Sequence, residues 1–326
     1  MKGRRKMLQN DSLPYQHYAQ SLGKVLTGTR VITSHKPHPK WIRASSVGFM
    51  CPREWVINYW LPHDYLESKP LSMFERFRMD MGSAGHDVFQ NEILGPMRLL
   101  VGNWVKDGEK SWGYWPGKGW RFVEEYAESQ ELGISGHHDG LLSPNRIMDV
   151  YKAVKARKLE SKILSQREAP EASAMYYLAE FKFVSSEVFN EINTVDQIPE
   201  YYRGQAAVYQ LLFRRPATVF FFVDRSSLSI RTFFYRGLQQ DLDKALFKCD
   251  LVWRAIRDET LPDAERKCST PTSSRAKKCT VAEECYLADP IYNGNSLKFF
   301  KKFVAKCKEI ASQRGLEHPL PLNYQK

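Results

Sequence analysis

The sequence lacks both a long uninterrupted apolar segment and a phosphate-binding loop. No stretch approaches the roughly 20 consecutive apolar residues that a membrane-spanning helix needs. The basic residues among the first ten positions are not followed by the apolar core of a secretion signal. The Walker A pattern G-x-x-x-x-G-K-[ST] is also missing. We therefore expect a cytoplasmic protein without membrane contact and without an ATPase motor of its own.

Acidic residues are the scarcer charge. Asp and Glu number 37 against 48 Lys and Arg, which gives a formal net charge of +11 and a pI near 9.2. Such an excess favours a polyanionic partner, with nucleic acid ahead of an anionic membrane surface. The hydrophobic fraction of 43%, with 13% aromatic residues, is ample for a packed core. The chain is therefore expected to fold by itself.

Cysteines are also few, with six in 326 residues. Without a secretion signal, a disulfide framework is a weaker interpretation than metal ligation or burial. Cys249 and Cys307 recur with apolar residues at helical spacing, which predicts two core positions. The other four are Cys51, Cys268, Cys279 and Cys285. Their spacing alone leaves an iron–sulfur cluster, zinc and unrelated thiols open.

Changes in texture along the chain predict its organisation. We expect an irregular basic arm at 1–40, a main domain at 41–290 and a basic amphipathic helix with a tail at 291–326. A basic insertion is expected at 152–172, because 152–167 holds six Lys or Arg against one Glu. The sequence shows neither an internal repeat nor a coiled-coil heptad pattern.

Hydrophobic periodicity predicts the elements of the main domain. They are, in chain order, helices at 45–61 and 71–94, a meander of strands at 101–144, a strand that begins near 176 and contains 180–182, a helix at 201–213, strands at 217–224 and 228–235, and a helix at 239–259. This order is typical of one α/β domain with a central mixed sheet, flanking helices and a helical cap.

Two acids and a lysine carry the most specific chemical signal. Asp139 follows Gly136-His137-His138 near a predicted strand turn, and Glu180-Phe181-Lys182 lies within a predicted strand. Because side chains alternate along a strand, Glu180 and Lys182 must share one face, with Phe181 on the other. Two carboxylates from separate strands can hold Mg²⁺ or Mn²⁺, and a nearby cation can orient an attacking water. Phosphodiester hydrolysis needs those parts.

An isolated E-x-K pattern is more often a solvated strand face than a catalytic one. Other residues strengthen the catalytic interpretation: His86 lies upstream beside small residues, and Gln205 and Tyr209 share one helix face at i and i+4. Asp149 is an alternative to Asp139 as the first of the two acids. His137 and His138 flank the candidate site, although a histidine in a turn is more often structural.

This pattern resembles the PD-(D/E)xK (restriction-endonuclease-like) superfamily, and within it the RecB-like iron–sulfur exonucleases of the CRISPR-associated and phage type. The resemblance covers residues 45–285. It implies a restriction-endonuclease-like mixed sheet and a metal site with catalytic Asp139, Glu180 and Lys182. It further implies that His86, the backbone carbonyl of Phe181, Asp139 and Glu180 bind the metal. The same resemblance assigns DNA-binding or supporting roles to Gln205, Tyr209 and Arg53.

The resemblance also bears on the four cysteines. The related nucleases carry one cysteine in an N-terminal segment and three beyond the nuclease core, as do Cys51, Cys268, Cys279 and Cys285 here. A 4Fe-4S cluster on these thiolates would staple the helical cap to the later segment, with zinc as the alternative. The first C-terminal pair is more widely spaced than in the family.

The resulting hypothesis is a divalent-metal-dependent deoxyribonuclease. By the resemblance it is an exonuclease on single-stranded DNA ends, acting in recombination, repair or phage replication in a bacterial or phage-infected cell, with a helicase or recombination partner in trans. The alternative is a non-catalytic zinc or iron–sulfur subunit that positions DNA for a partner. Aromatic residues at 104–120, interleaved with lysines, are candidates for stacking unpaired bases, although a hairpin packing its own aromatics is the more frequent arrangement.

Overall fold

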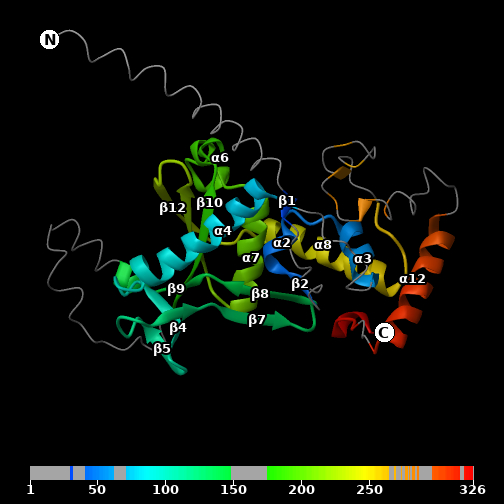
Figure 1. The fold of residues 1–326 in the computed structure, drawn as a ribbon, viewed down its shortest axis with the longest axis horizontal. Helices are drawn as coiled ribbons and strands as arrows, with labels where there is room; N and C mark the ends of the chain where they lie inside the picture. Colours follow the sequence, from blue (N-terminus) through cyan, green and yellow to red (C-terminus); the bar gives the residue numbers. More distant parts are fainter. Residues whose placement is uncertain are drawn as a thin grey trace, which may run out of the picture.

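The computed structural model of the chain describes residues 30–31, 41–61, 71–147, 175–263, 296–315 and 319–325, together with isolated positions between 268 and 285. Most of the predicted basic arm at 1–40, the basic insertion at 152–172 and the rival Asp149 lie outside the described residues. The described part is an α/β fold with a mixed sheet flanked by helices (Figure 1). This confirms the coarse fold class predicted from the sequence.

A seven-stranded sheet forms the centre of the fold. Its strand order is β12-β11-β10-β9-β4-β5, and β6 also pairs with β4. The strands are β4 (Leu100–Lys106), β5 (Glu109–Tyr114), β6 (Arg121–Val123), β9 (Gly140–Leu142), β10 (Tyr177–Val184), β11 (Thr218–Asp224) and β12 (Ile230–Tyr235). β10 and β11 pair in parallel and the other pairs are antiparallel. The predicted meander and the later two strands are thus confirmed.

Two strands of the predicted meander belong to a second, three-stranded sheet. It is ordered β2-β8-β7, from Ile42–Arg43, Ile134–His138 and Glu125–Ser129. The chain passes from β8 into β9 of the large sheet through Asp139 and Gly140. Gly140 has a φ of +157°, and a Cβ there would lie 2.2 Å from the side chain of Leu100. A glycine is therefore needed where the chain changes sheets, next to Asp139.

The predicted helix at 45–61 is two helices. α2 spans Ala44–Val47 and α3 spans Pro52–Trp60, with Cys51 in an extended conformation between them. Pro52 has no amide hydrogen and disfavours helical geometry in the residue before it. The predicted helix at 71–94 is also divided, into α4 (Met73–Asp87) and the π-helical η1 (Val88–Leu94). π-helical turns are frequent at functional sites, and His86 lies at this junction.

Helices cover both faces of the large sheet. Phe89 and Leu94 of η1 pack against Phe181 on one face, while the other face meets α6 (Ser186–Glu191) and α7 (Glu200–Phe213). α8 (Gln239–Arg257) packs against α3 and α7 and extends away from the sheets toward α12 (Ser296–Gln313) (Figure 1). None of the described helices has the length and apolar character needed to cross a membrane.

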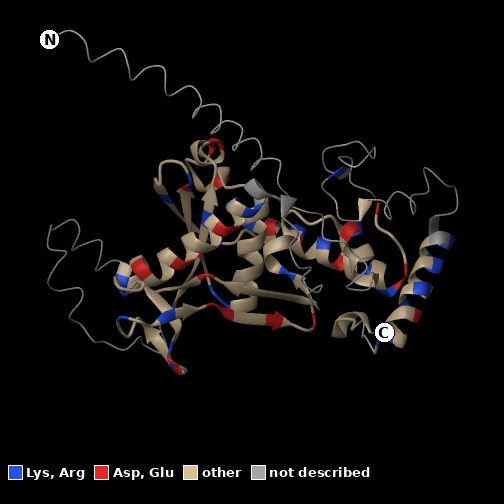
Figure 2. Ribbon diagram, in the orientation of Figure 1, with Lys and Arg blue, Asp and Glu red and all other residues tan. Residues whose placement is uncertain are grey.

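The predicted core cysteines are confirmed. Cys249 lies buried on α8, and Cys307 lies buried on α12 among apolar side chains of the same core. The opposite side of α12 carries exposed lysines (Figure 2). α12 is therefore the basic amphipathic helix expected from the sequence.

Candidate active site

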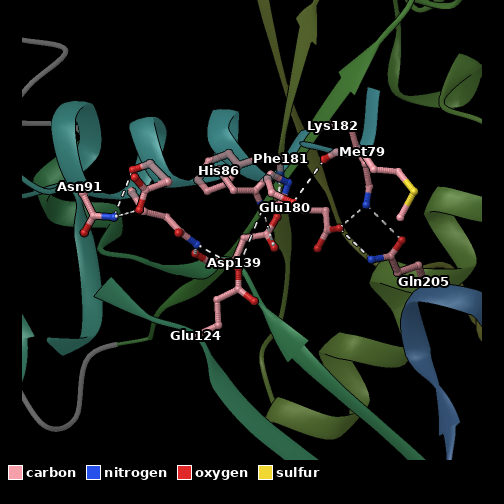
Figure 3. A network of polar contacts seen from close by, with 12 residues as sticks. Met79, His86, Asn91, Glu124, Asp139, Glu180, Phe181, Lys182 and Gln205 are labelled. Carbon is pink, nitrogen blue, oxygen red and sulfur yellow. Dashed lines mark hydrogen bonds and ion pairs between the residues drawn. The ribbon is translucent and has the colours of Figure 1, made fainter. Parts of the chain in front are cut away.

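Six of the predicted site residues line one cavity of about 720 Å³. They are His86 from the end of α4, Asp139 from the junction between the two sheets, Glu180 and Lys182 from β10, and Gln205 and Tyr209 from α7. Figure 3 shows His86, Asp139 and Glu180 converging from these separate elements. The structure therefore brings together side chains that are far apart in the sequence.

Glu180 and Lys182 lie on the same face of β10, as the alternation predicted. The Nζ of Lys182 is 2.5 Å from Oε1 of Glu180. Gln205 of α7 joins them, because its amide Nε2 donates to Glu180 at 2.7 Å and its Oε1 accepts from Lys182 at 3.2 Å. Lys182 also lies 5.0 Å from the ring centre of Tyr202. These contacts hold the carboxylate and the ammonium in one orientation.

Asp139 is held by the backbone of β10 and by His86. Its Oδ2 accepts a 2.7 Å hydrogen bond from the amide of Phe181, and its Oδ1 lies 3.4 Å from Nδ1 of His86. The side chain of Gln90, from η1, donates to the Asp139 carbonyl at 2.8 Å. Asp139 is therefore fixed from both sides of the site.

Glu124 is a further carboxylate that the sequence analysis did not select. Its Oε1 lies 3.9 Å from Nδ1 of His86 and accepts from Gln90 at 3.2 Å. One ligand atom from each of His86, Glu124 and Asp139 lies within 4.8 Å of the other two. An imidazole and two carboxylates at this separation are suitable ligands for a divalent cation. The sequence signal for Glu124 is weak: it lies in an alternating segment, where it would share a face with Tyr126.

The electrostatics of the site also favour a cation. Burial raises the pKa of Glu180 to about 7, although the charge of Lys182 acts to lower it. Burial acts to lower the pKa of His86, but its hydrogen bond with Asp139 and the charge of that carboxylate raise it to about 10. A site that holds an imidazole proton this firmly concentrates negative potential, which a divalent ion would neutralise.

The two supporting residues predicted on α7 are both buried at the site. Gln205 makes the hydrogen bonds described above, and Tyr209 lines the same cavity beside Gly136 of β8.

The two histidines that precede Asp139 lie in different environments. His138 is buried, 3.3 Å from Oε2 of Glu125 and against the ring of Phe213, whereas His137 is exposed and lines the cavity. His138 is thus structural.

Gly85 sets the distance between α4 and β10. A Cβ at this position would lie 2.3 Å from Cζ of Phe183, so in Gly85→Ala either the Phe183 ring or the helix must shift, and we expect the helix to move and carry His86 from Asp139. We expect a loss of about 1–3 kcal/mol in unfolding free energy from the overpacking. The rise in melting temperature on adding Mn²⁺ should also shrink, because a displaced His86 weakens binding to the native state.

Gly82, on the same helix, is the matched control. An added Cβ there would meet no atom within 4 Å. Gly82→Ala should therefore stabilise the protein by up to about 1 kcal/mol through helix propensity and leave the Mn²⁺ shift unchanged. Equal Mn²⁺ shifts in both variants would show that the approach of α4 to β10 does not position a metal ligand.

Arg53 lies apart from the cavity, which corrects the prediction that it contacts DNA. It is 3% exposed, and its guanidinium donates to the carbonyl of Pro262 at 3.1 Å, the carbonyl of Cys285 at 3.2 Å and Sγ of Cys285 at 3.1 Å. A side chain buried in this way has no access to a phosphate. Arg53 instead ties α3 to the segment that follows α8.

Three of the four predicted cluster cysteines come near one another at this tie. Burial, together with the charges of Glu54, Cys285 and Cys51, raises the pKa of Cys279 to about 12. Cys51 is buried at the start of α3, while Cys279 and Cys285 pack against the same core. Cys268 is half-buried.

Comparison with known proteins adds little to this geometry. No protein-family model matches the chain, and no curated protein matches it. Among solved structures, it is similar to the crystal structure of SSO0001, with a TM-score of 0.37 and 11% identity, over 83% of this chain and 95% of that chain. A similarity at this level carries no argument about function, so the assignment rests on the site.

Proposed function

We propose that this protein is a divalent-metal-dependent deoxyribonuclease that hydrolyses phosphodiester bonds at the cavity between α4, α7 and β10. The observation that carries the proposal is the convergence of His86, Asp139 and Glu180 beside the ammonium of Lys182. Hard oxygen ligands and a lysine are the parts that metal-assisted phosphodiester hydrolysis requires. The positive net charge supports a polyanionic substrate.

Each residue has a role in the proposed reaction. Bound Mg²⁺ or Mn²⁺ would supply Lewis-acid activation of water and a counter-charge for the phosphate. Asp139, Glu180, His86 and the carbonyl of Phe181 would hold the ion, and the position of Glu124 supports a further ligand. Lys182, oriented by Gln205, orients the attacking water and stabilises the negative charge that develops on the phosphate. Tyr209 lines the same cavity and packs against Gly136 of β8.

The order of these residues supports membership of the PD-(D/E)xK superfamily, with the RecB-like iron–sulfur exonucleases as the nearest type. On this proposal the enzyme degrades DNA from single-stranded ends, with unwinding supplied by a partner, since the sequence contains no Walker A motif. The mixed sheet with flanking helices is compatible with that superfamily. The competing hypothesis is a subunit that binds DNA without cleaving it.

The proposal includes a 4Fe-4S cluster held by Cys51, Cys268, Cys279 and Cys285. The charges of Cys285 and Cys51 raise the pKa of Cys279, which supports the cluster because it places the three thiols in one neighbourhood. The hydrogen bond from Arg53 to Sγ of Cys285 also supports it. Such a cluster would join α3 to the segment after α8 and serve as a structural staple. Zinc on the same thiolates is the alternative, and the two differ in colour, because a cluster absorbs visible light and d¹⁰ zinc does not.

The deciding experiment is degradation of end-labelled single- and double-stranded DNA with Mg²⁺ or Mn²⁺. We expect cleavage by the intact protein and loss of cleavage by about a hundredfold or more in Glu180→Gln, which removes one charged ligand. Glu187→Gln, an exposed acid on α6, is the matched control and should cleave like the unaltered protein. If the folded, metal-loaded protein cleaves neither substrate, the binding-subunit hypothesis replaces the nuclease.

A further inference from the structure

The face of the small sheet that lines the cavity carries an ordered ladder of side chains. The register of β7 and β8 pairs Tyr126 with His137 and Glu128 with Ser135. Glu124 and Asp139 lie just outside the two strands, one residue beyond the paired Glu125 and His138. All six of these side chains line the cavity. The ladder therefore begins at the candidate metal ligands and continues away from them.

The second step of this ladder is aromatic. The rings of Tyr126 and His137 have centroids 5.0 Å apart with an interplanar angle of 49°. Tyr126 is 50% exposed, and its hydroxyl donates to Oε2 of Glu128 at 2.7 Å, which fixes the direction of the ring. Alternate residues of a strand are about 7 Å apart. A flat, oriented ring is thus presented one step from Asp139 and Glu124.

We propose that the Tyr126–His137 pair is a stacking platform for an unpaired nucleobase next to the phosphate being cleaved. Every base has a π-face, so stacking on an aromatic ring holds single-stranded nucleic acid regardless of sequence. A base stacked within a duplex does not present a free face to the ring. The inference rests on the proposed function for the identity of the neighbouring phosphate, and it makes the unpaired strand the substrate class.

The charges around the platform fit this occupant. Arg43 of β2 is exposed and pairs with Ser135 of β8, so it borders the third step of the ladder. Lys182 lines the same cavity, beside Glu180. A strand whose base lies on Tyr126 therefore has two cations of this cavity available to its phosphates. Glu128, which accepts the hydrogen bond from Tyr126, disfavours a phosphate at the platform itself, where a base is expected.

The test is binding of a fluorescent oligothymidylate, with Mn²⁺ present, to variants made in a Glu180→Gln background that does not consume the probe. Tyr126→Ala should weaken binding of the single strand by about 5- to 100-fold, the range that corresponds to loss of one stacked base. Tyr126→Phe, which keeps the ring, should bind nearly as the parent does. Blunt duplex of the same length should bind equally to all variants.

A second aromatic of equal exposure is the matched control. Trp112 on β5 is 49% exposed and does not line the cavity. Trp112→Ala should leave single-strand binding unchanged. In the parent, an abasic nucleotide placed beside the terminal phosphate should weaken binding as much as Tyr126→Ala does, and the two changes together should weaken it no further.

The possible outcomes separate this inference from the nuclease proposal. If the intact protein cleaves DNA but Tyr126→Ala binds single strands as the parent does, or loses single strands and duplex equally, the platform is wrong and the nuclease stands. If the intact protein cleaves nothing while Tyr126→Ala selectively loses single-strand binding, the platform stands and the nuclease is wrong.

Discussion

Lys182→Met is expected to reduce DNA cleavage by about a hundred- to ten-thousand-fold, the range for removing a group that acts on charge or proton transfer in the transition state. Methionine keeps the length of the side chain and removes the ammonium that lies 2.5 Å from Glu180. Binding of single-stranded DNA should fall much less, because only one of several phosphate contacts is lost. Cleavage rates at saturating DNA, together with binding isotherms, separate the two effects.

The pH of this experiment matters. Lys182 acts to lower the pKa of Glu180, which burial raises to about 7, so the variant will hold a proton on Glu180 to a higher pH. The comparison therefore belongs well above that pH, where Glu180 is ionised in both proteins and Mn²⁺ affinity is similar. A loss of cleavage that disappears on raising the pH would mean that Lys182 serves only to keep Glu180 ionised.

The control for charge is Lys244→Met. Lys244 is exposed on α8 and its Nζ lies 2.9 Å from Oε1 of Glu200, so this variant also loses one positive charge and one ion pair. A solvent-exposed pair contributes little to stability, and we expect wild-type cleavage. If Lys244→Met and Lys182→Met lose activity equally, the effect is one of net charge and Lys182 has no special role.

Cys279→Ser is expected to remove iron from the purified protein and to cause the largest loss of stability among the cysteine variants. Cys279 lies near Cys51 and Cys285, on the segment that Arg53 ties to α3. Binding of a structural metal contributes directly to folding free energy. Loss of the proposed cluster should therefore lower the melting temperature and expose the chain after α8 to protease. Anaerobic purification, visible absorption and metal analysis provide the measurements.

Cys249→Ala and Cys307→Ala are the matched controls. Both residues are buried thiols of the core, so each variant should lose about 1–3 kcal/mol from packing while retaining full iron content. Iron retained in Cys279→Ser would remove that residue from the proposed ligands. A colourless unaltered protein that contains zinc would replace the cluster by the zinc alternative and leave the staple in place.

Local sequence patterns predicted the elements well, and failed where backbone chemistry competes with periodicity. The helix at 201–213 and the strands of the later hairpin agree with α7, β11 and β12 to within two residues. The helix at 45–61 was wrong as one element, because Pro52 ends the run of helical hydrogen bonds and starts a new helix. The expected meander did form, but its strands divided between two sheets.

The site shows the same division. Glu180 and Lys182 could be paired in advance because two residues on one strand share a face whatever the rest of the chain does. Glu124 could not be selected, because acids beside strands are common and its approach to His86 depends on how α4 packs, which no local pattern specifies. Arg53 received a DNA-binding or supporting role from the resemblance, whereas its burial depends on a segment more than two hundred residues away.

The sequence by itself determined the periodicities, the E-x-K face of β10, the core positions of Cys249 and Cys307, and the positive charge of the chain, since all of these depend on near neighbours or on composition. Only the tertiary structure decided that His86 meets Asp139, that Glu124 joins them and that Tyr126 lies one step away. Those contacts depend on strand register and on helix packing, such as the approach that Gly85 permits, which long-range burial sets and local patterns do not specify.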